Sequence, residues 1–483
     1  LEKKSVQRAE RPVLTPDGKY LIASIKPFFA ETKDAQRKKL KPDQMPKDTL
    51  GIYNCLTGEL IKYPFLESFK KGLYGNKYIA YQTKMPADTT KGKEPAKKDK
   101  KAGSDLMVFH LESGTTDTLK AVSEYSFSPG GDSLFVVRRP GSQDSLLDAG
   151  LFMYTPKNKE LRTIYTSDSG QTVKLPVISQ DNRHLAFLVK PDSTKTGNDS
   201  ASIFYYTEGL PRAEVLIENE NLEDGWQISD NREPVFSKSG HRIFFGIAPV
   251  RPMKDTTLLE ADIARLDIWH YKDNYVQPQQ LINLKRELER SYLCVADIGK
   301  ELNIRQLARE EYPQVHVPCE HDADWGYSVS DYNYQLESMW SADPRADLYI
   351  INVNDGTSEL VLKDHYISNV GASPEGKYLV WYNNLDSLWY SYNRANKEIV
   401  CITPDMPVSF ANELHDTPEM ARSYGYSAWA EGDKAVYIND RYDVWQIDPS
   451  GQTPPVALTD GLGRHEEITF RIARPDYVVY PPG

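Results

Sequence analysis

The sequence has few cysteines and no long apolar run, and both absences narrow the class of protein. Among its 483 residues there are four cysteines, Cys55, Cys294, Cys319 and Cys401, and none of them belongs to a Cys-x-x-Cys pair. This spacing does not indicate a disulfide framework, although it leaves one or two bridges open. No stretch approaches the roughly 18 uninterrupted apolar residues of a membrane-spanning helix. We therefore expect a chain without a membrane span.

Basic residues are also fewer than acidic residues. The chain has 58 Lys and Arg against 69 Asp and Glu, which gives a formal net charge of -11. Nucleic-acid binding needs a basic stripe or patch, and the one basic run, residues 91–101, contains no aromatic side chain and has the composition of a solvated loop. The sequence thus argues against nucleic acid as a partner. Because the chain starts at Leu1 without an initiator Met, we expect that any signal peptide has already been removed.

The motifs of common catalytic and nucleotide sites are missing as well. None of the 29 glycines has another glycine four positions on, so the chain has no Gly-x-Ser-x-Gly nucleophile elbow, whose strained turn needs small neighbours. Gly461 and Gly463 begin a dinucleotide fingerprint, but Glu466 stands where its third glycine belongs. We therefore predict no catalytic residue and no cofactor for this chain.

What the sequence does contain is a segment that recurs. A polar turn of the type Ser-Pro-Asp-Gly-Lys leads into an apolar strand, most clearly in the copies that begin at Leu14, Phe127, Phe236 and Ala372. Most of these turns are spaced by about 50 to 60 residues, the span of a four-stranded propeller blade with its loops. The turn residues lie at Gly18, Gly75, Gly130, Asp181, Gly240, Gly376 and Gly432. The pattern predicts an all-β fold, a β-propeller with WD-like or Tol-type repeats.

Counting the repeats refines this prediction. Eight aromatic and aliphatic hairpins imply about eight blades in one domain over residues 1–483, or seven if one hairpin is an insertion. The interval from Gly240 to Gly376 is about twice the others, so a degenerate blade is expected near His321. Blade five is expected to be enlarged, with a short helix from Leu281, whereas the polar segment from Glu31 is expected to be a loop.

Two polar clusters are candidate functional sites. Residues 319–325 hold the densest group of Cys, His and Asp, which are metal-ligand types, but no second cluster at ligand spacing supports a metal, so a hydrogen-bonded rim loop is favoured. Paired glutamates in the last blade could hold a substrate amino terminus, although a solvated strand end is favoured. The candidate rim or substrate contacts are His321, Asp322, Asp324, Trp325, Glu466 and Glu467.

A third motif leaves another reading open. Residues 166–172 resemble the Asp box of sialidase propellers, a turn that an aspartate stabilises through backbone N–H groups. The box occurs once, so a chance turn is favoured. A propeller glycosidase is therefore the least favoured reading of the chain.

The longest run of specific sequence begins at Gly225 and ends at Ile298. It resembles a segment of large bacterial serine peptidases of the prolyl oligopeptidase family, which includes dipeptidyl and acylaminoacyl peptidases. The DIWHYKD and QPQQ elements from Asp267, with the HDADW stretch from His321, are the specific part of this resemblance. The Ser-Pro-Asp-Gly-Lys turns are less specific, because other WD-like propellers share them. Family members have an N-terminal β-propeller and a C-terminal α/β-hydrolase domain.

The resemblance covers essentially the whole chain, but only the propeller half of the family. It implies that the catalytic triad belongs to a hydrolase domain expected after residue 483, since no position here matches the triad. The implied function is a non-catalytic propeller that gates the access of short peptides to that domain. A periplasmic or secreted location is implied as well. The alternative is a free-standing propeller that binds a protein or a cell-envelope component.

Overall fold

The computed structural model describes residues 5–85, 102–141, 146–168, 170–192, 200–251, 257, 261, 263, 266–299 and 301–473. The chain divides into two compact units, Leu1–Asn219 and Glu220–Gly483. Antiparallel strands that pair in sequence order make up most of the regular structure of both units. The predicted all-β fold class is confirmed.

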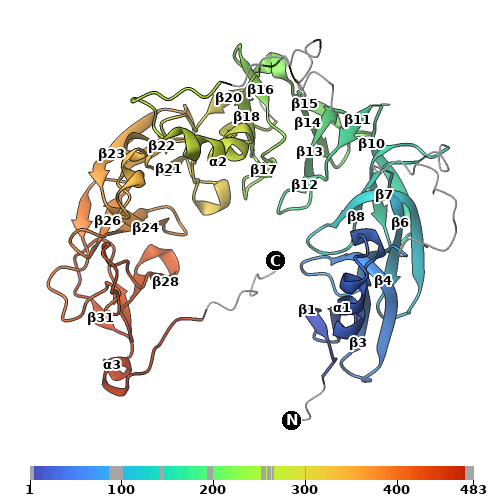
Figure 1. Ribbon diagram of the computed structural model, residues 1–483, viewed down its shortest axis with the longest axis horizontal. Coiled ribbons are helices and arrows are strands. Elements are labelled where there is room, and N and C mark those ends of the chain that lie inside the picture. The colour runs from blue at the N-terminus through green and yellow to red at the C-terminus, as the bar shows by residue number, and fades with distance from the viewer. Residues whose placement is uncertain are drawn as a thin grey trace. The chain divides into compact units, whose positions relative to one another are not determined.

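In the first unit, strands β1 to β10 follow one another as neighbours in a ten-stranded sheet (Figure 1). Two of them, β4 and β7, have 12 residues each, and the two halves of each pair with different neighbours. Each long strand therefore closes one four-stranded blade and opens the next, so this sheet contains three blades. Strands β11 to β15 form a fourth. The strands are β1 (Ala9–Leu14), β2 (Tyr20–Ile25), β3 (Asp48–Asn54), β4 (Leu60–Lys71), β5 (Tyr78–Thr83), β6 (Ser104–His110), β7 (Thr116–Phe127), β8 (Leu134–Arg138), β9 (Gly150–Thr155), β10 (Glu160–Thr166), β11 (Gln171–Val173), β12 (Val177–Ile178), β13 (His184–Pro191), β14 (Ser202–Thr207) and β15 (Glu214–Ile217).

The second unit contains four separate sheets. They are β16–β20, β21–β23, β24–β27 and β28–β31. The strands are β16 (Trp226–Ile228), β17 (Val235–Phe236), β18 (Arg242–Pro249), β19 (Tyr292–Asp297), β20 (Ile304–Gln306), β21 (Trp325–Ser330), β22 (Ala346–Asn352), β23 (Ser358–His365), β24 (Ile367–Ala372), β25 (Tyr378–Asn383), β26 (Leu388–Asn393), β27 (Ile399–Cys401), β28 (Tyr426–Trp429), β29 (Val436–Asn439), β30 (Val444–Ile447) and β31 (Val456–Ala457). With the four blades of the first unit, the described residues contain the eight blades predicted from the repeats.

Blade six is the degenerate one, as predicted. Its sheet has three strands, β21 to β23, and the place of the inner strand is taken by residues around His316, which form an isolated bridge with Tyr327. Blade five is enlarged, also as predicted, because the helix α2 (Gln277–Leu288) lies in the connection between β18 and β19. The prediction of a single domain over residues 1–483 stays a prediction.

One expectation for the first unit is wrong. The segment from Glu31 was expected to be a loop, but the helix α1 (Phe29–Arg37) covers its first part. The carboxylate of Glu31 accepts a hydrogen bond from the backbone N–H of Phe28 (3.2 Å), and Ala35 is buried. A local cap and one packed side chain thus help to order this highly charged segment as a helix.

The predicted polar turns share one hydrogen-bonding pattern. In five blades a Ser or Thr opens the turn, and its hydroxyl accepts a hydrogen bond from the backbone N–H five residues on, at 3.0 to 3.2 Å. The residue three positions after the hydroxyl has a positive φ in each case, which favours Gly. The five hydroxyl residues are buried, and they are Thr15, Ser128, Ser179, Ser237 and Ser373.

Successive blades share apolar cores. Along β25, Leu379 and Trp381 belong to a cluster with the residues of blade six, whereas Val380 and Tyr382 belong to a cluster with those of blade eight. This alternation is the period-two pattern of a strand buried on both faces. It explains why the blade strands are rich in both aromatic and β-branched residues.

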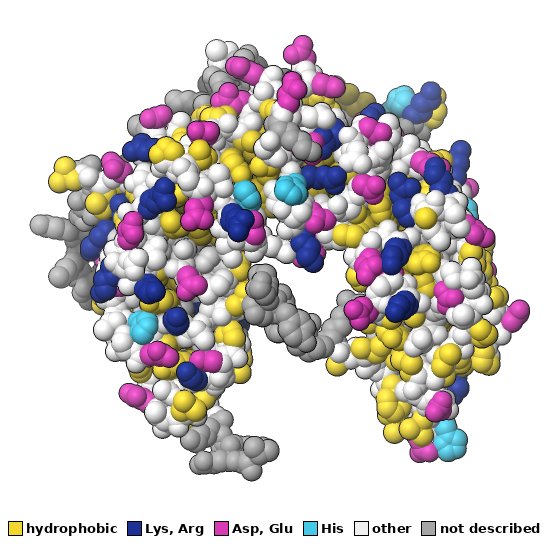
Figure 2. Space-filling view, turned by 180° about the vertical axis from the view of Figure 1, so that it is seen from behind, with side chains coloured by type: hydrophobic (Ala, Val, Ile, Leu, Met, Phe, Trp, Pro, Cys, Tyr) yellow, Lys and Arg dark blue, Asp and Glu magenta, His cyan; other side chains and the backbone are white. Residues whose placement is uncertain are grey.

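The surface agrees with the charge balance of the sequence. On the face shown in Figure 2, the described Lys and Arg side chains are interspersed with Asp and Glu rather than gathered in a stripe. No helix of the described residues is long and apolar enough to cross a membrane. All four cysteines are free thiols.

The turn hydroxyl of blade seven should contribute measurably to stability. Ser373 accepts the N–H of Tyr378 (3.0 Å) and donates to the buried carboxylate of Asp433 (2.5 Å). Ser373→Ala leaves both groups without these partners, so we expect unfolding to cost about 1–3 kcal/mol less than in the unmodified protein. Urea denaturation measures this change.

The matched control is Ser338→Ala, since Ser338 is exposed and, among the described residues, its hydroxyl bonds only the nearby Gln335 carbonyl. We expect it to change stability by less than about 0.5 kcal/mol. Equal effects of the two substitutions would show that the buried turn hydroxyl contributes no more to stability than an exposed one.

Candidate functional site

The described part of the second unit contains a pocket of about 390 Å³ beside the insertion of blade five. Its walls come from the end of β18, the segment before α2, the end of α2 with the start of β19, the loop after β20, and the short 3₁₀ helix η6 (Tyr332–Tyr334). The aromatic and charged side chains that line the pocket are Tyr275, Tyr292, Tyr332, Arg251, Glu287, Arg290 and Glu310.

Helix α2 contributes the polar residue Glu287 to the pocket, and several of its apolar side chains are about half exposed. Its one buried residue is Asn283, which accepts a hydrogen bond from Gln279 one turn earlier (3.3 Å). Glu287 lies one turn later on the same side and lines the pocket. The apolar residues face the other way: Leu281, Leu284 and Leu288 are 58%, 49% and 45% exposed. An ordinary surface helix buries its apolar stripe, whereas the buried residue of α2 is the polar Asn283, and Glu287 (39% exposed) is about as accessible as Leu288 (45% exposed).

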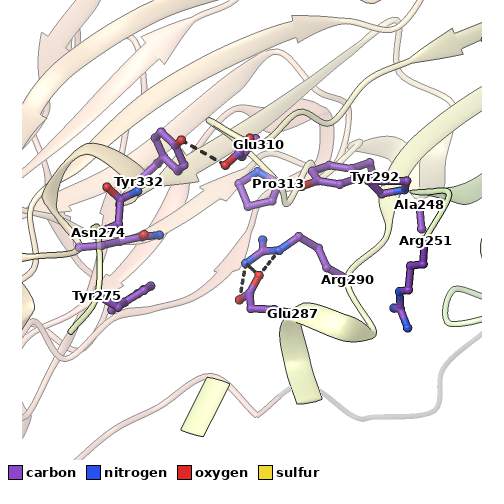
Figure 3. A pocket seen from close by; sticks show the side chains of 12 residues that line it. Ala248, Arg251, Asn274, Tyr275, Glu287, Arg290, Tyr292, Glu310, Pro313 and Tyr332 are labelled. Carbon is purple, nitrogen blue, oxygen red and sulfur yellow. Dashed lines mark hydrogen bonds and ion pairs between the residues drawn. The ribbon is translucent and has the colours of Figure 1, made fainter. Parts of the chain in front are cut away.

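Glu287 and Arg290 form a two-pronged pair at this wall (Figure 3). Arg290 donates from Nε and from Nη2 to the two carboxylate oxygens of Glu287, and each distance is 2.6 Å. This is the strong bidentate geometry of a guanidinium and a carboxylate. The hydrogen bond from Arg290 holds the pKa of Glu287 below its usual range, although burial opposes that shift. Both groups therefore carry their charges at neutral pH.

Glu310 and Tyr332 form a second pair in the same pocket (Figure 3). The Tyr332 hydroxyl donates to Oε1 of Glu310 at 3.2 Å. Burial raises the pKa of Tyr332, and the negative charge of Glu310 adds to that shift. The phenol therefore stays protonated and can donate at neutral pH.

The other two tyrosines give the pocket aromatic surface. Tyr292 is buried and packs edge-to-face on Trp226, with ring centroids 5.5 Å apart. Burial raises the pKa of Tyr275 and of Tyr292, so both hydroxyls remain uncharged. Among the described residues that line the pocket there is no serine, cysteine or histidine. The arrangement suits binding through fixed charges, hydroxyls and ring faces rather than nucleophilic catalysis.

The predicted cluster at residues 319–325 lies in the tight turn that enters β21. Cys319, Glu320 and His321 have left-handed backbone angles, with φ of 54°, 51° and 71°. Each such residue costs of order 1 kcal/mol or more, so the surroundings must hold the turn in place. Asp322 does so by accepting hydrogen bonds from the backbone N–H (3.0 Å) and the hydroxyl (2.7 Å) of Ser239 in blade five.

The remaining members of this cluster have different surroundings. The ring of His321 lies 5.1 Å from that of Phe244, and burial lowers the pKa of His321. Asp324 is exposed. Trp325 is 2% exposed, and its Nε1 donates to the Gly376 carbonyl of blade seven (3.0 Å). Trp325 therefore links two blades.

The paired glutamates lie at the end of the last blade. Glu466 is the final residue of the short helix α3 (Leu462–Glu466), and Glu467 caps it with a left-handed backbone. The Glu466 carboxylate lies 2.7 Å from Nδ1 of His465. Neither glutamate lines the pocket, and neither does the 319–325 turn. The role of the six predicted residues in substrate contact stays a prediction.

Within the described residues, no group of three or more His, Cys, Asp or Glu is placed to hold a metal ion. The sequence patterns predict none of the pocket residues themselves. One signal could have pointed to them, because the enlarged blade five brings tyrosines and opposite charges into the same segment that carries the family resemblance. Their convergence with Glu310 and Tyr332 depends on tertiary structure.

Comparison with known proteins finds only distant structural similarity. No protein-family model matches the chain, and no curated protein matches it either. Among solved structures, the chain is similar to the β-propeller domain of the Trilobed protease from Pyrococcus furiosus, with 13% sequence identity and a TM-score of 0.32. The match covers 83% of this chain and 99% of that domain. It is similar to Porphyromonas gingivalis dipeptidyl peptidase 4, with 11% identity, a TM-score of 0.39 and 94% of this chain covered, but it spans only 60% of that peptidase.

An oligogalacturonate lyase solved in complex with manganese is matched as well, with 11% identity, 86% of this chain and 96% of that chain covered, and a TM-score of 0.32. Peptidases and a lyase thus share the likeness at the same low identity. These matches do not distinguish one activity from another.

The pair of Glu287 and Arg290 should make stability depend on pH. The pKa of Glu287 is lower in the folded protein than in the unfolded chain, so its contribution is present above about pH 4.3, the ordinary glutamate value, and is lost as the pH falls through the folded pKa. We expect the stability difference between the unmodified protein and Glu287→Gln to shrink below that pH. Urea denaturation at a series of pH values measures it, with Glu289→Gln as the control. A difference that stays constant down to pH 3 would contradict the assignment.

Trp325 should act as a structural link between blades. Trp325→Phe removes the indole N–H that bonds the Gly376 carbonyl, and we expect a loss of about 1–3 kcal/mol in the free energy of unfolding. Trp269→Phe is the matched control, because Trp269 is 67% exposed, and its effect should stay within about 0.5 kcal/mol. An unchanged stability of Trp325→Phe would rule out the structural role.

Proposed function

We propose that this chain is the non-catalytic β-propeller of a serine peptidase of the prolyl oligopeptidase family, and that it gates the access of short peptides to a hydrolase domain. The observation that carries the proposal is the place of the pocket. The run from Gly225 to Ile298, which carries the family resemblance, includes α2 and supplies Tyr275, Glu287 and Arg290 to the pocket. The part of the sequence that carries the family resemblance thus supplies several of the residues that line the pocket.

The chemistry of the pocket supports a peptide as its ligand. Peptides present amide N–H and C=O groups, charged termini and side chains, and the pocket offers hydroxyls, fixed charges and tyrosine rings to meet them. A volume of about 390 Å³ suits a short peptide rather than a folded protein. Selection by access and exclusion of water are the physical contributions that a propeller can make to a neighbouring active site. A periplasmic or secreted location belongs to the same proposal.

The apolar side of α2 favours a second candidate function. Leu281, Leu284 and Leu288 are exposed on one side of the helix, and exposed apolar surface of this kind often marks contact with another protein. A free-standing propeller that binds a protein or a cell-envelope component would use such a surface. The two functions differ in whether a serine hydrolase is encoded together with the propeller.

The test uses a serine-reactive fluorophosphonate probe. We expect the full-length gene product to become labelled and to hydrolyse chromogenic dipeptide or acyl-peptide substrates, whereas residues 1–483 alone remain unlabelled and inactive. Reading the gene beyond the codon for Gly483 should reveal a Gly-x-Ser-x-Gly motif in a segment of ordinary domain size, roughly 200 to 250 residues. A stop codon at that point, or labelling of residues 1–483 themselves, would refute the proposal and favour the binding propeller.

A further inference from the structure

The inner strand of blade five is interrupted by a bulge that carries an arginine. Strands β16 and β17 both pair with β18, and their register leaves residues 229–234 opposite only Phe245 and Gly246. A bulge of this kind turns a side chain away from the regular pleat. Arg232 lies in the bulge, and its Nε donates a hydrogen bond to the Ser291 hydroxyl at 3.2 Å.

The Arg232 side chain lies on one face of β18, next to a histidine. A Cβ atom on Gly246 would come within 2.7 Å of the Cβ atom of Arg232, so glycine leaves the room that the arginine needs. Phe244 is two residues away on the same strand and faces the same side. The ring of His321 lies against the Phe244 ring, with centroids 5.1 Å apart. Arg232 and His321 thus occupy neighbouring positions on this face.

A second histidine lies beside them. His316 and Tyr327 exchange two backbone hydrogen bonds of 2.9 Å, and the centroids of their rings are 5.4 Å apart. Desolvation lowers the pKa of His316 and of His321, and the positive charge of Arg232 adds to both shifts. His316 also acts on His321. The guanidinium is therefore close to both imidazole rings, and the rings are close to each other.

The arginine of this group has no carboxylate partner. Among the described residues Arg232 donates only to Ser291, whereas Arg242 and Arg305 both form ion pairs with Asp297. Burial lowers the pKa of the Arg232 guanidinium. A half-buried cation without an anion is costly, so the remaining donors of Arg232 are available to a ligand that carries negative charge.

The surrounding ionisable groups do not neutralise it. Asp230 and Glu233 belong to the same bulge, and neither forms an ion pair with the arginine within the described part of the chain. Glu320, which precedes the second ring in the cluster, lies 2.8 Å from Nζ of Lys238. The thiol of Cys294 acts on the guanidinium, but burial raises the pKa of that thiol to about 12, so it is uncharged at neutral pH.

We infer that Arg232, His316 and His321 form a binding site for a tetrahedral oxyanion such as phosphate or sulfate. A guanidinium and two imidazole rings bring N–H donors from three segments of the chain. Donors from several directions suit a tetrahedral anion better than a planar carboxylate. His316 is exposed and the other two side chains are half-buried, so an ion can reach them. None of the three lines the pocket of blade five, so the inference does not rest on the proposed function.

The two histidines should couple anion binding to protons. In the absence of an anion, desolvation and the charge of Arg232 favour the neutral rings. A bound dianion favours the charged rings, so it raises the pKa of both. Binding therefore takes up protons, and the affinity for the anion rises as the pH falls.

The experiment is calorimetric titration of the chain with sodium sulfate at pH 6 and at pH 8, at constant ionic strength. Sulfate remains a dianion at both values, so a change in affinity reports the protonation of the protein. We expect sulfate to bind about tenfold more tightly at pH 6. We expect acetate, a planar carboxylate, to bind at least about tenfold more weakly than sulfate.

Variants assign the two effects to their residues. Arg232→Gln should weaken sulfate at least about tenfold at both pH values. The double substitution His316→Gln and His321→Gln should remove the pH dependence and leave weak binding. Arg309→Gln and His270→Gln are the matched controls, because both side chains are exposed and lie outside the cluster, and each should change the affinity less than about twofold. Circular dichroism and urea denaturation confirm that each variant is folded.

A spectroscopic readout separates a binding role from a structural one. The ring resonances of His316 and His321, assigned with the single variants, should titrate at a higher pH when sulfate is saturating. Unchanged titrations, no binding of sulfate, equal affinity for acetate, equal affinity at the two pH values, or full affinity in Arg232→Gln would overturn the inference.

A comparison of inorganic phosphate with glycerol 3-phosphate at pH 7 identifies the source of the oxyanion. Equal affinities would support a site for the phosphoryl group of a larger molecule, and binding of inorganic phosphate alone would support a site for the free ion. All of these outcomes are independent of whether the gene encodes a hydrolase, so the failure of one proposal is distinguishable from the failure of the other.

Discussion

A buried hydroxyl at the entry of the blade turns is the contact on which the rest of the structure depends. In five blades it accepts the backbone N–H that begins the second strand, where Ser373 bonds Tyr378 and Thr15 bonds Tyr20, each at 3.0 Å. A buried donor without this acceptor would cost about as much as a hydrogen bond gives. The turn therefore closes in one way, and the register of the strands that follow is set by it. Blade eight has Ala430 at this position. There the buried carboxylate of Asp433 instead accepts hydrogen bonds from the Ser373 hydroxyl and the Glu375 N–H in the turn of blade seven.

Neighbouring blades of the second unit are joined through these same turns. Asp433 bonds Ser373, Asp322 bonds Ser239, and Trp325 bonds the Gly376 carbonyl. These contacts are polar, directional and at least partly buried, whereas the apolar clusters between blades constrain position more loosely. A strained turn such as Cys319–His321 can persist because its neighbours on both sides hold it. The polar cluster that stands out in the sequence is thus largely accounted for by the joining of blades.

The sequence predicts the blades well because their determinants are local. A turn hydroxyl, a residue that tolerates positive φ and a period-two strand are all visible within about a dozen residues. Even so, the left-handed residue is Gly131 rather than Gly130, and Asn182 rather than Asp181, because it must lie three positions after the hydroxyl. The pocket could not be predicted in the same way. Tyr332 and Glu310 meet Glu287 only after separate blades have formed, and no local pattern states which side of α2 faces inward.

The orientation of α2 is the clearest conflict between sequence pattern and structure, and it connects the fold to the site. Leu281, Leu284 and Leu288 are about half exposed, so completing their burial would gain on the order of 1 kcal/mol per side chain; the buried residue of the helix is instead the polar Asn283, and Glu287, 39% exposed, lines the pocket. Part of that lost burial is offset by the bidentate bond from Arg290 to Glu287, because a carboxylate held by a guanidinium is stable where an unpaired one is not. Local rules are most often broken at functional sites. A helix that leaves apolar side chains half exposed, while its Glu287 holds the guanidinium of Arg290 beside a pocket, is therefore better explained by what the pocket binds than by the stability of the blade.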